Sequence, residues 1–101
     1  MKKEKITQKD AVLLLLKYKP HATFYLIRDE LPAYYRKDLS FTLQKMAYDK
    51  LISRKTDTKK IEWKYDLTLH GDKILRKRFA QLRHDDSTVN RLEGLVYAFG
   101  M

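Results

Sequence analysis

The sequence feature that most constrains the fold is a run of six apolar residues, AVLLLL, at positions 11–16. The run lies within a predicted helix from Gln8 to Tyr18, which is therefore apolar most of the way round. We expect such a helix to lie at the centre of the core. Thr7 is a suitable N-cap, Asp10 approximates the acidic partner of a capping box, and Pro20 ends the helix.

Two amphipathic helices are predicted next. The first covers residues 24–31 after the N-cap Thr23, and the second covers residues 37–50 after the connector PAYY at 32–35. In both helices, large apolar residues recur at the spacing of one helix face. These residues are Phe24, Ile27 and Leu31 in the first helix and Leu39, Leu43 and Met46 in the second. Each helix should therefore bury one side and expose the other.

A β-hairpin is predicted after these helices. LISRKT at 51–56 has strand character, DTKK at 57–60 is a polar turn, and IEWKYDL at 61–67 alternates between apolar and polar residues. The alternation puts one set of side chains on the buried side of the second strand, namely Ile61, Trp63, Tyr65 and Leu67. Two further helices complete the chain, one over 69–83 after the cap Thr68 and one at 87–99.

These elements predict one domain over residues 1–101, mainly α with a small β-hairpin (α+β). Three helices followed by a hairpin is the order of a winged helix-turn-helix, here with additional C-terminal helices. The chain has no Cys, which excludes a disulfide framework, and no segment approaches the length of a membrane span. We therefore expect a cytoplasmic protein.

A family resemblance is carried by LIRDELPAYYRKDLSFTLQKMAYDKLISRK at 26–55 and by YDLTLHGDKIL at 65–75. These stretches resemble the winged-helix transcriptional regulators of bacteria and archaea, broadly of the MarR and PadR kind. The second stretch contains the Y-x-L-T-x-x-G pattern that leads from the wing to the next helix in that family. The resemblance covers about residues 8–83. It departs in a connection between the second and third helices that is one residue longer, and in Lys50, where many relatives have Gly.

The resemblance implies sequence-specific binding of double-stranded DNA by a winged-helix core at 7–68. The helix over 37–50 would enter the major groove, and the wing at 54–60 would lie on the backbone or the minor groove. The formal net charge of +9 is consistent with an anionic partner. Its positive charge is concentrated in residues 1–19, 36–64 and 69–84.

Candidate DNA contacts fall into two groups. On the exposed side of the helix over 37–50, Gln can pair with adenine, Lys can donate to guanine and an aromatic ring can pack on a thymine methyl. The candidate base-reading residues are Lys37, Ser40, Phe41, Gln44 and Lys45. Basic and hydroxyl side chains nearby are suited to phosphate oxygens. The candidate backbone and wing contacts are Tyr34, Tyr35, Arg36, Tyr48, Arg54, Lys55, Thr58, Lys59 and Lys60.

Structural alternatives stay open for several of these residues. Phe41 can pack against Tyr34 or the first helix instead of meeting DNA. Lys45 and Lys50 can be ordinary solvated charges. The basic residues of the helix over 69–83 are expected to form a solvated face, which consists of Lys73, Arg76, Lys77 and Arg78.

The last helix carries more apolar residues than covering one side of a core requires. We predict a two-fold homodimer interface made of Leu82, Val89, Leu92, Leu95, Val96 and Phe99. Such a dimer would present two DNA-reading helices to half-sites about one helical turn apart. The alternative is that this helix packs back onto the helix over 8–18 in a monomer.

Catalysis, a metal site and a cofactor are not expected. His21, His70 and His84 lack ligand spacing, Cys is absent, and three scattered glycines cannot form a phosphate-binding loop. The sequence specifies no small-molecule effector and predicts no membrane partner. Two alternatives to a regulator stay open. One is an architectural or plasmid/chromosome-segregation DNA-binding protein with low sequence discrimination, and the other is a winged-helix protein-interaction adaptor.

Overall fold

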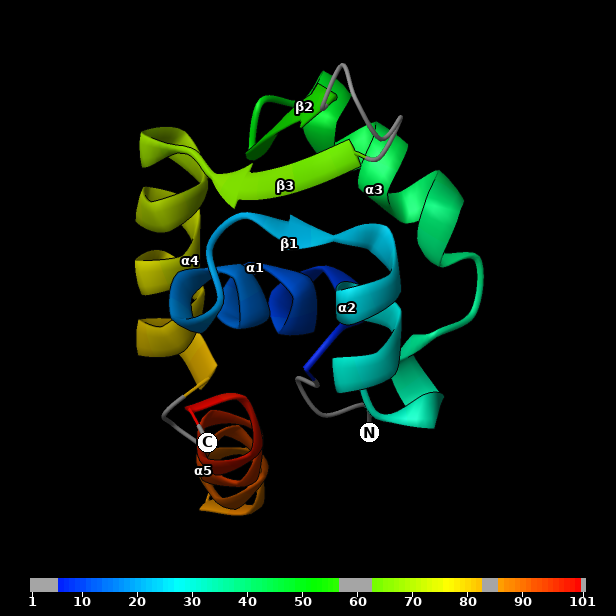
Figure 1. The fold of residues 1–101 in the computed structure, drawn as a ribbon. Helices are drawn as coiled ribbons and strands as arrows, with labels where there is room; N and C mark the ends of the chain where they lie inside the picture. The colour runs from blue at the N-terminus through cyan, green and yellow to red at the C-terminus, as the bar shows by residue number, and fades with distance from the viewer. Residues whose placement is uncertain (1–5, 57–62, 83–85, 101) are drawn as a thin grey trace.

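The computed structural model describes residues 6–56, 63–82 and 86–100. Within these ranges, five α-helices and a small antiparallel sheet form a mainly helical α+β fold, as predicted (Figure 1). No helix of these ranges is long and apolar enough to cross a membrane. The elements in chain order are α1 (Gln8–Tyr18), β1 (Ala22–Thr23), α2 (Phe24–Glu30), the 3-10 helix η1 (Ala33–Tyr35), α3 (Leu39–Tyr48), β2 (Ile52–Thr56), β3 (Trp63–Leu67), α4 (Leu69–Leu82) and α5 (Asp86–Gly100).

Helix α1 lies at the centre of the molecule, as its apolar run predicts (Figure 1). Each residue from Ala11 to Leu16 is at most 1% exposed, and α2, α4, α5 and β3 all pack against this helix. A capping box closes its N-terminus: the Asp10 N–H donates to Thr7 Oγ1 at 3.1 Å, and the Thr7 N–H donates to Asp10 Oδ2 at 3.0 Å. The observed bounds of α1 equal the predicted ones.

Asp10 also connects α1 to α4. Its carboxylate is 1% exposed and accepts hydrogen bonds from Arg78 Nε at 3.0 Å and from Arg78 Nη2 at 2.8 Å. A buried carboxylate is tolerated only when it is paired and hydrogen-bonded, which Arg78 accomplishes here. The prediction that Arg78 belongs to a solvated face is therefore wrong.

The sheet has three strands in the order β1-β3-β2, whereas the sequence predicts a hairpin alone. The additional strand, β1, pairs antiparallel with β3 through Ala22↔Tyr65 and Thr23↔Lys64. It is held by His21, whose N–H donates to Asp66 Oδ1 at 2.8 Å and whose Nδ1 lies 3.0 Å from Asp66 Oδ2. A strand of two residues leaves no periodic pattern, so this strand was not predictable from the sequence.

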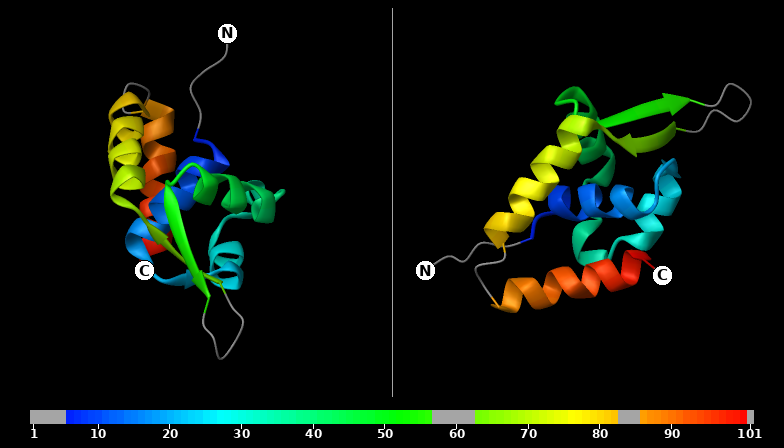
Figure 2. Two further views of the ribbon diagram at one scale, coloured as in Figure 1. Left: turned by 90° about the horizontal axis from the view of Figure 1, so that it is seen from above. Right: turned by 90° about the vertical axis from the view of Figure 1, so that its left-hand side faces the viewer.

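Strands β2 and β3 form the predicted hairpin, which lies at the end of the molecule opposite α5 (Figure 2). Tyr65 is buried, as its place in the alternation predicts. Trp63 lies on the same side of β3 as Tyr65, as the alternation predicts, but it is 43% exposed. Ile61 and the turn at 57–60 lie outside the described residues.

Helix α3 is shorter than the predicted 37–50 and has a residue with left-handed backbone close to each end. Asp38 precedes it at φ 54°, and Lys50 follows it at φ 65°. At the C-terminus the Leu51 N–H donates to the Met46 carbonyl at 3.0 Å and the Lys50 N–H donates to the Ala47 carbonyl at 3.1 Å. This is a Schellman motif with Lys50 in the position that usually holds Gly.

The hairpin and α4 meet at Gly71. The Gly71 N–H donates to the Thr68 hydroxyl at 2.9 Å, which makes Thr68 the predicted cap of α4. A Cβ at position 71 would lie 2.0 Å from the Leu51 carbonyl oxygen. Only glycine allows this approach between α4 and the start of β2, which accounts for the Gly in the Y-x-L-T-x-x-G pattern. The final residue of the predicted 69–83 helix lies outside the described part of the chain.

Candidate functional site

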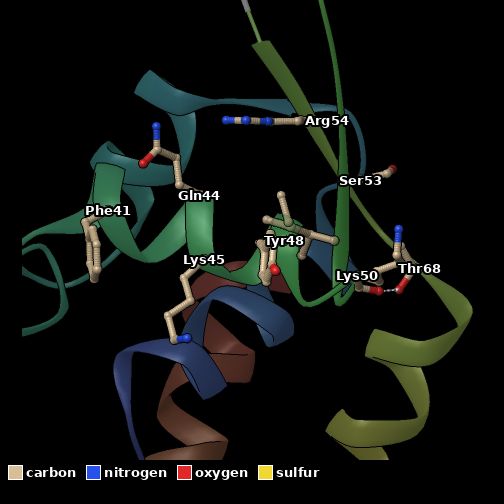
Figure 3. A pocket seen from close by; sticks show the side chains of 10 residues that line it. Phe41, Gln44, Lys45, Tyr48, Lys50, Ser53, Arg54 and Thr68 are labelled. Atoms are coloured by element: carbon tan, nitrogen blue, oxygen red, sulfur yellow. Dashed lines mark hydrogen bonds between the residues drawn. The ribbon is translucent and has the colours of Figure 1, made fainter.

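An open groove of about 760 Å³ lies between α3 and β2 (Figure 3). Phe41, Gln44, Lys45 and Tyr48 line it from α3, and Arg54 lines it from β2. In Figure 3, Gln44 projects from α3 on the side over which Arg54 extends, whereas Phe41 and Lys45 project from the opposite edge of the helix. The groove brings together five residues that the sequence assigns to DNA contact.

The helical period of α3 separates a buried side from an exposed side. Leu39, Leu43 and Met46 are buried, as predicted. On the outer side, Phe41 is 66% exposed and Tyr48 is 84% exposed. The Phe41 ring is therefore largely open to solvent and is not part of the core, which does not support the alternative in which this ring packs into the protein.

Arg54 is held over the ring of Trp63, with its guanidinium carbon 4.5 Å from the ring centroid. This cation–π contact restricts a long side chain that would otherwise sample many rotamers. The sequence did not predict that Trp63 orients Arg54, which lines the groove. Arg54 pairs with Tyr65 across the strands, which makes Trp63 its diagonal neighbour on the same side of the sheet. The pairing register of the hairpin is thus the feature from which the contact between Arg54 and Trp63 could have been predicted.

Two lysines face each other on the other side of the hairpin. Lys55 of β2 and Lys64 of β3 are direct cross-strand partners, and both are exposed. Like charges placed directly opposite each other destabilise a strand pair. The hairpin thus carries positive charge on both sides, and Lys64 contributes to it. Thr58, Lys59 and Lys60 lie outside the described residues.

Two residues predicted as backbone contacts use their side chains in the turn before α3. Burial makes the predicted contact of Tyr35 wrong, whereas Arg36 is exposed and its contact with DNA stays a prediction. Tyr35 is buried, and burial raises the pKa of its phenol. Arg36 Nε donates to the Leu31 carbonyl at 2.7 Å, and Arg36 Nη2 donates to the Asp29 carbonyl at 3.3 Å. These bonds satisfy carbonyl groups that the end of α2 leaves without helical partners. Tyr34, in contrast, is exposed, as are Lys37 and Ser40.

The residues predicted for a dimer interface divide into two groups. Three of them are buried within their own chain and belong to its core, which corrects their assignment: Leu82, Leu95 and Phe99. Val89 and Val96 line an open groove of about 580 Å³ between α4 and α5, together with Phe79 and Tyr97. Leu92 is buried, but it also lines this groove. Tyr97 is 71% exposed there.

The described residues contain no group of three or more His, Cys, Asp or Glu side chains that could hold a metal ion. Comparisons of the chain with protein-family models, with curated proteins and with solved structures found no match. The chemistry of the α3–β2 groove must therefore be inferred from its own residues.

Proposed function

We propose that this protein is a winged helix-turn-helix protein that binds a specific double-stranded DNA sequence and regulates transcription. In this proposal α2 and α3 form the helix-turn-helix, and α3 is the recognition helix that enters the major groove. The wing, which is residues 54–60 with the strands β2 and β3 that carry it, lies on the adjacent backbone or minor groove. Such a protein would act in the cytoplasm, at the nucleoid.

The observation that supports the proposal best is the outer side of α3, which is free of core contacts and faces a groove shared with a basic strand. The major groove of DNA is about 12 Å wide and admits one α-helix. Gln44 can form a bidentate pair with adenine, Lys45 can donate to guanine, and Phe41 can pack on a thymine methyl.

The charge on the wing supports an anionic partner. The repulsion between Lys55 and Lys64 is relieved when a phosphate lies near them, and their binding releases condensed counterions from the DNA. Arg54 is already oriented by Trp63, so less side-chain entropy is lost when it binds a phosphate.

We extend the proposal to a homodimer that forms through the α4–α5 groove. Val96 and Tyr97 leave apolar surface open there, and in a two-fold dimer each copy would cover that surface on the other. Tyr97→Glu should convert the dimer to a monomer in sedimentation experiments. Tyr25→Glu changes another exposed tyrosine, on α2, and should leave the dimer intact. A wild-type monomer at tens of micromolar would contradict this extension.

Selection of bound duplexes from a random DNA pool tests the main proposal. A regulator should enrich one site, which for a dimer is palindromic, and should bind it about 10³-fold or more tightly than random DNA. The selected and random duplexes are then titrated at several salt concentrations to separate base recognition from phosphate binding.

Two other outcomes would replace the proposal. Equal affinity for all duplexes with a steep salt dependence would identify an architectural or segregation protein, which the paired lysines of the wing also suit. No affinity for DNA at low salt would identify a protein-interaction adaptor, for which the exposed rings of Tyr34, Phe41 and Tyr48 are the supporting observation.

A further inference from the structure

Helix α3 begins without a cap of its own. Its N-cap residue, Asp38, has a left-handed backbone at φ 54°, and the Asp38 side chain makes no capping hydrogen bond. A helix usually gains its first side-chain acceptor from the N-cap residue. The beginning of α3 must therefore be fixed by contacts from elsewhere in the molecule.

Gln8, in the first turn of α1, supplies these contacts. Its Nε2 donates to the carbonyl oxygens of Tyr35 and Lys37, both at 2.7 Å. Its Oε1 accepts a hydrogen bond from Thr42 Oγ1 at 2.6 Å. The two carbonyls precede Asp38 and the hydroxyl follows it, so a single side chain spans the entry to α3. Both donors of the amide are used, and its orientation is thereby defined.

The backbone of Gln8 is itself well anchored. It lies between Thr7 and Asp10, the two partners of the α1 capping box, and Asp10 is held in turn by Arg78 of α4. The run that follows, 11–16, is the most buried segment of α1. Gln8 therefore ties the entry of α3 to the most firmly packed part of the molecule.

We infer that Gln8 is a positioning residue for α3, and this inference rests on the proposed function. Thr42, which Gln8 holds, stands next to Phe41 and two residues before Gln44 on the same helix. Bidentate base contacts require close alignment, so a small rotation or shift of α3 weakens them. Phosphate contacts tolerate such shifts better, because Lys acts as a point charge on a flexible stem. Gln8 thus contributes to sequence discrimination without reading a base.

The test compares two substitutions that remove the same hydrogen bond from opposite sides. Gln8→Met keeps the length of the side chain and removes all three hydrogen bonds, whereas Thr42→Val removes only the bond between Gln8 and Thr42. The affinities for the selected duplex and for random DNA are measured for each variant. In a separate experiment, amide hydrogen exchange of residues 38–43 is measured in the free protein. Thr42→Ser, which keeps the hydroxyl, serves as the rescue variant.

We expect Gln8→Met to weaken binding to the selected duplex by about tenfold. This loss of affinity corresponds to part of the binding free energy of one bidentate base contact. Binding to random DNA should change by less than about twofold. Thr42→Val should have a smaller effect in the same direction and add little to Gln8→Met in the double variant. Thr42→Ser should bind like the wild type.

The matched control is Thr23→Ala, which removes the N-cap hydrogen bond to the Leu26 N–H of α2 and leaves the entry of α3 intact. It should lower the melting temperature without changing the ratio of the two affinities.

If Gln8→Met and Thr42→Val speed amide exchange at residues 38–43 but leave the ratio of the two affinities unchanged, the positioning role is wrong although the protein binds DNA selectively. If the wild type itself binds no duplex selectively, the proposed function fails first. If Gln8→Met does not fold, the ratio of the two affinities in Thr42→Val decides whether the positioning role is correct.

Discussion

Helices α1 and α3 are nearly equal in length, at 11 and 10 residues, but they are held in place by different means. α1 closes its own N-terminus with a capping box and is surrounded by the core. α3 buries one side only, and the residues with left-handed backbone close to its two ends are Asp38 and Lys50. Its entry is held by Gln8 of α1. The exposed helix α3 is thus held in position by the buried helix α1. Mutations in α1 and in α3 should therefore have different effects on stability and on DNA binding.

The largest effect is expected in α1. Leu14→Ala should lower the free energy of unfolding by about 2–5 kcal/mol, because it leaves a cavity in a fully packed site. Leu14→Met conserves most of the volume and should cost less than about 1.5 kcal/mol. Urea denaturation measures both values. A loss below about 1 kcal/mol for Leu14→Ala would show that α1 is not the centre of the core.

The outer side of α3 should behave in the opposite way. Gln44→Ala should change the free energy of unfolding by no more than about 0.5 kcal/mol. It should weaken the selected duplex by about 1–3 kcal/mol more than random DNA, because a base contact is lost. Lys55→Ala is the control for phosphate binding and should weaken both duplexes alike. Equal losses on both duplexes after Gln44→Ala would remove this residue from base reading.

A smaller effect is expected where α3 ends. A left-handed backbone costs a residue other than Gly about 1–2 kcal/mol, and a substitution by Gly removes this cost. Part of the stability gained is offset by the greater conformational entropy of Gly in the unfolded chain. Lys50→Gly should therefore raise the free energy of unfolding by up to about 1 kcal/mol. Lys50 also lines the groove, so the same change should weaken DNA binding.

Lys50→Ala separates the two effects of that change. It removes the charge and keeps the backbone cost, so it should weaken binding with no gain in stability. Thermal unfolding and DNA titration of the two variants provide the comparison. If Lys50→Gly gains stability and keeps full affinity, the Lys50 side chain has no part in binding.

The smallest effect concerns the exposed end of α1. Lys17 Nζ lies 3.0 Å from Asp72 Oδ1 of α4, and the hydrogen bond from Lys17 lowers the pKa of that carboxyl. A carboxyl with a lowered pKa in the folded state stabilises the protein above its unfolded pKa, and this contribution is lost as the pH falls through the folded pKa. Asp72→Asn should therefore be slightly less stable than the wild type at pH 7, and the difference should vanish in acid. A difference that persists below the folded pKa would have another cause.

Local signals made much of this structure predictable from the sequence. The capping residue Thr7, the apolar run 11–16 and Pro20 all lie within or beside α1, and its bounds were predicted correctly. The exposed side of α3 followed from the spacing of Leu39, Leu43 and Met46. In each case the residues that decide the outcome are close together in the chain.

The unpredicted features depend on residues that only the fold brings together. Asp10 and Arg78 are 68 residues apart, and Gln8 and Thr42 are 34 apart. Tyr35 and Arg36 were assigned to DNA because they are basic or carry a hydroxyl. The turn before α3 places one in the core and uses the other to close α2. The sequence shows the chemistry of these two side chains, but it does not show which way each of them points in the fold.

The contact between Arg54 and Trp63 has a practical consequence. Trp63 is the single tryptophan of the chain, and its partly exposed ring lies under a guanidinium at the edge of the groove. Its fluorescence emission depends on the charge and the water around it. Binding of unlabelled DNA at the wing should therefore change this emission, with Trp63→Phe as the blank. The protein carries an optical reporter at the surface where binding is proposed.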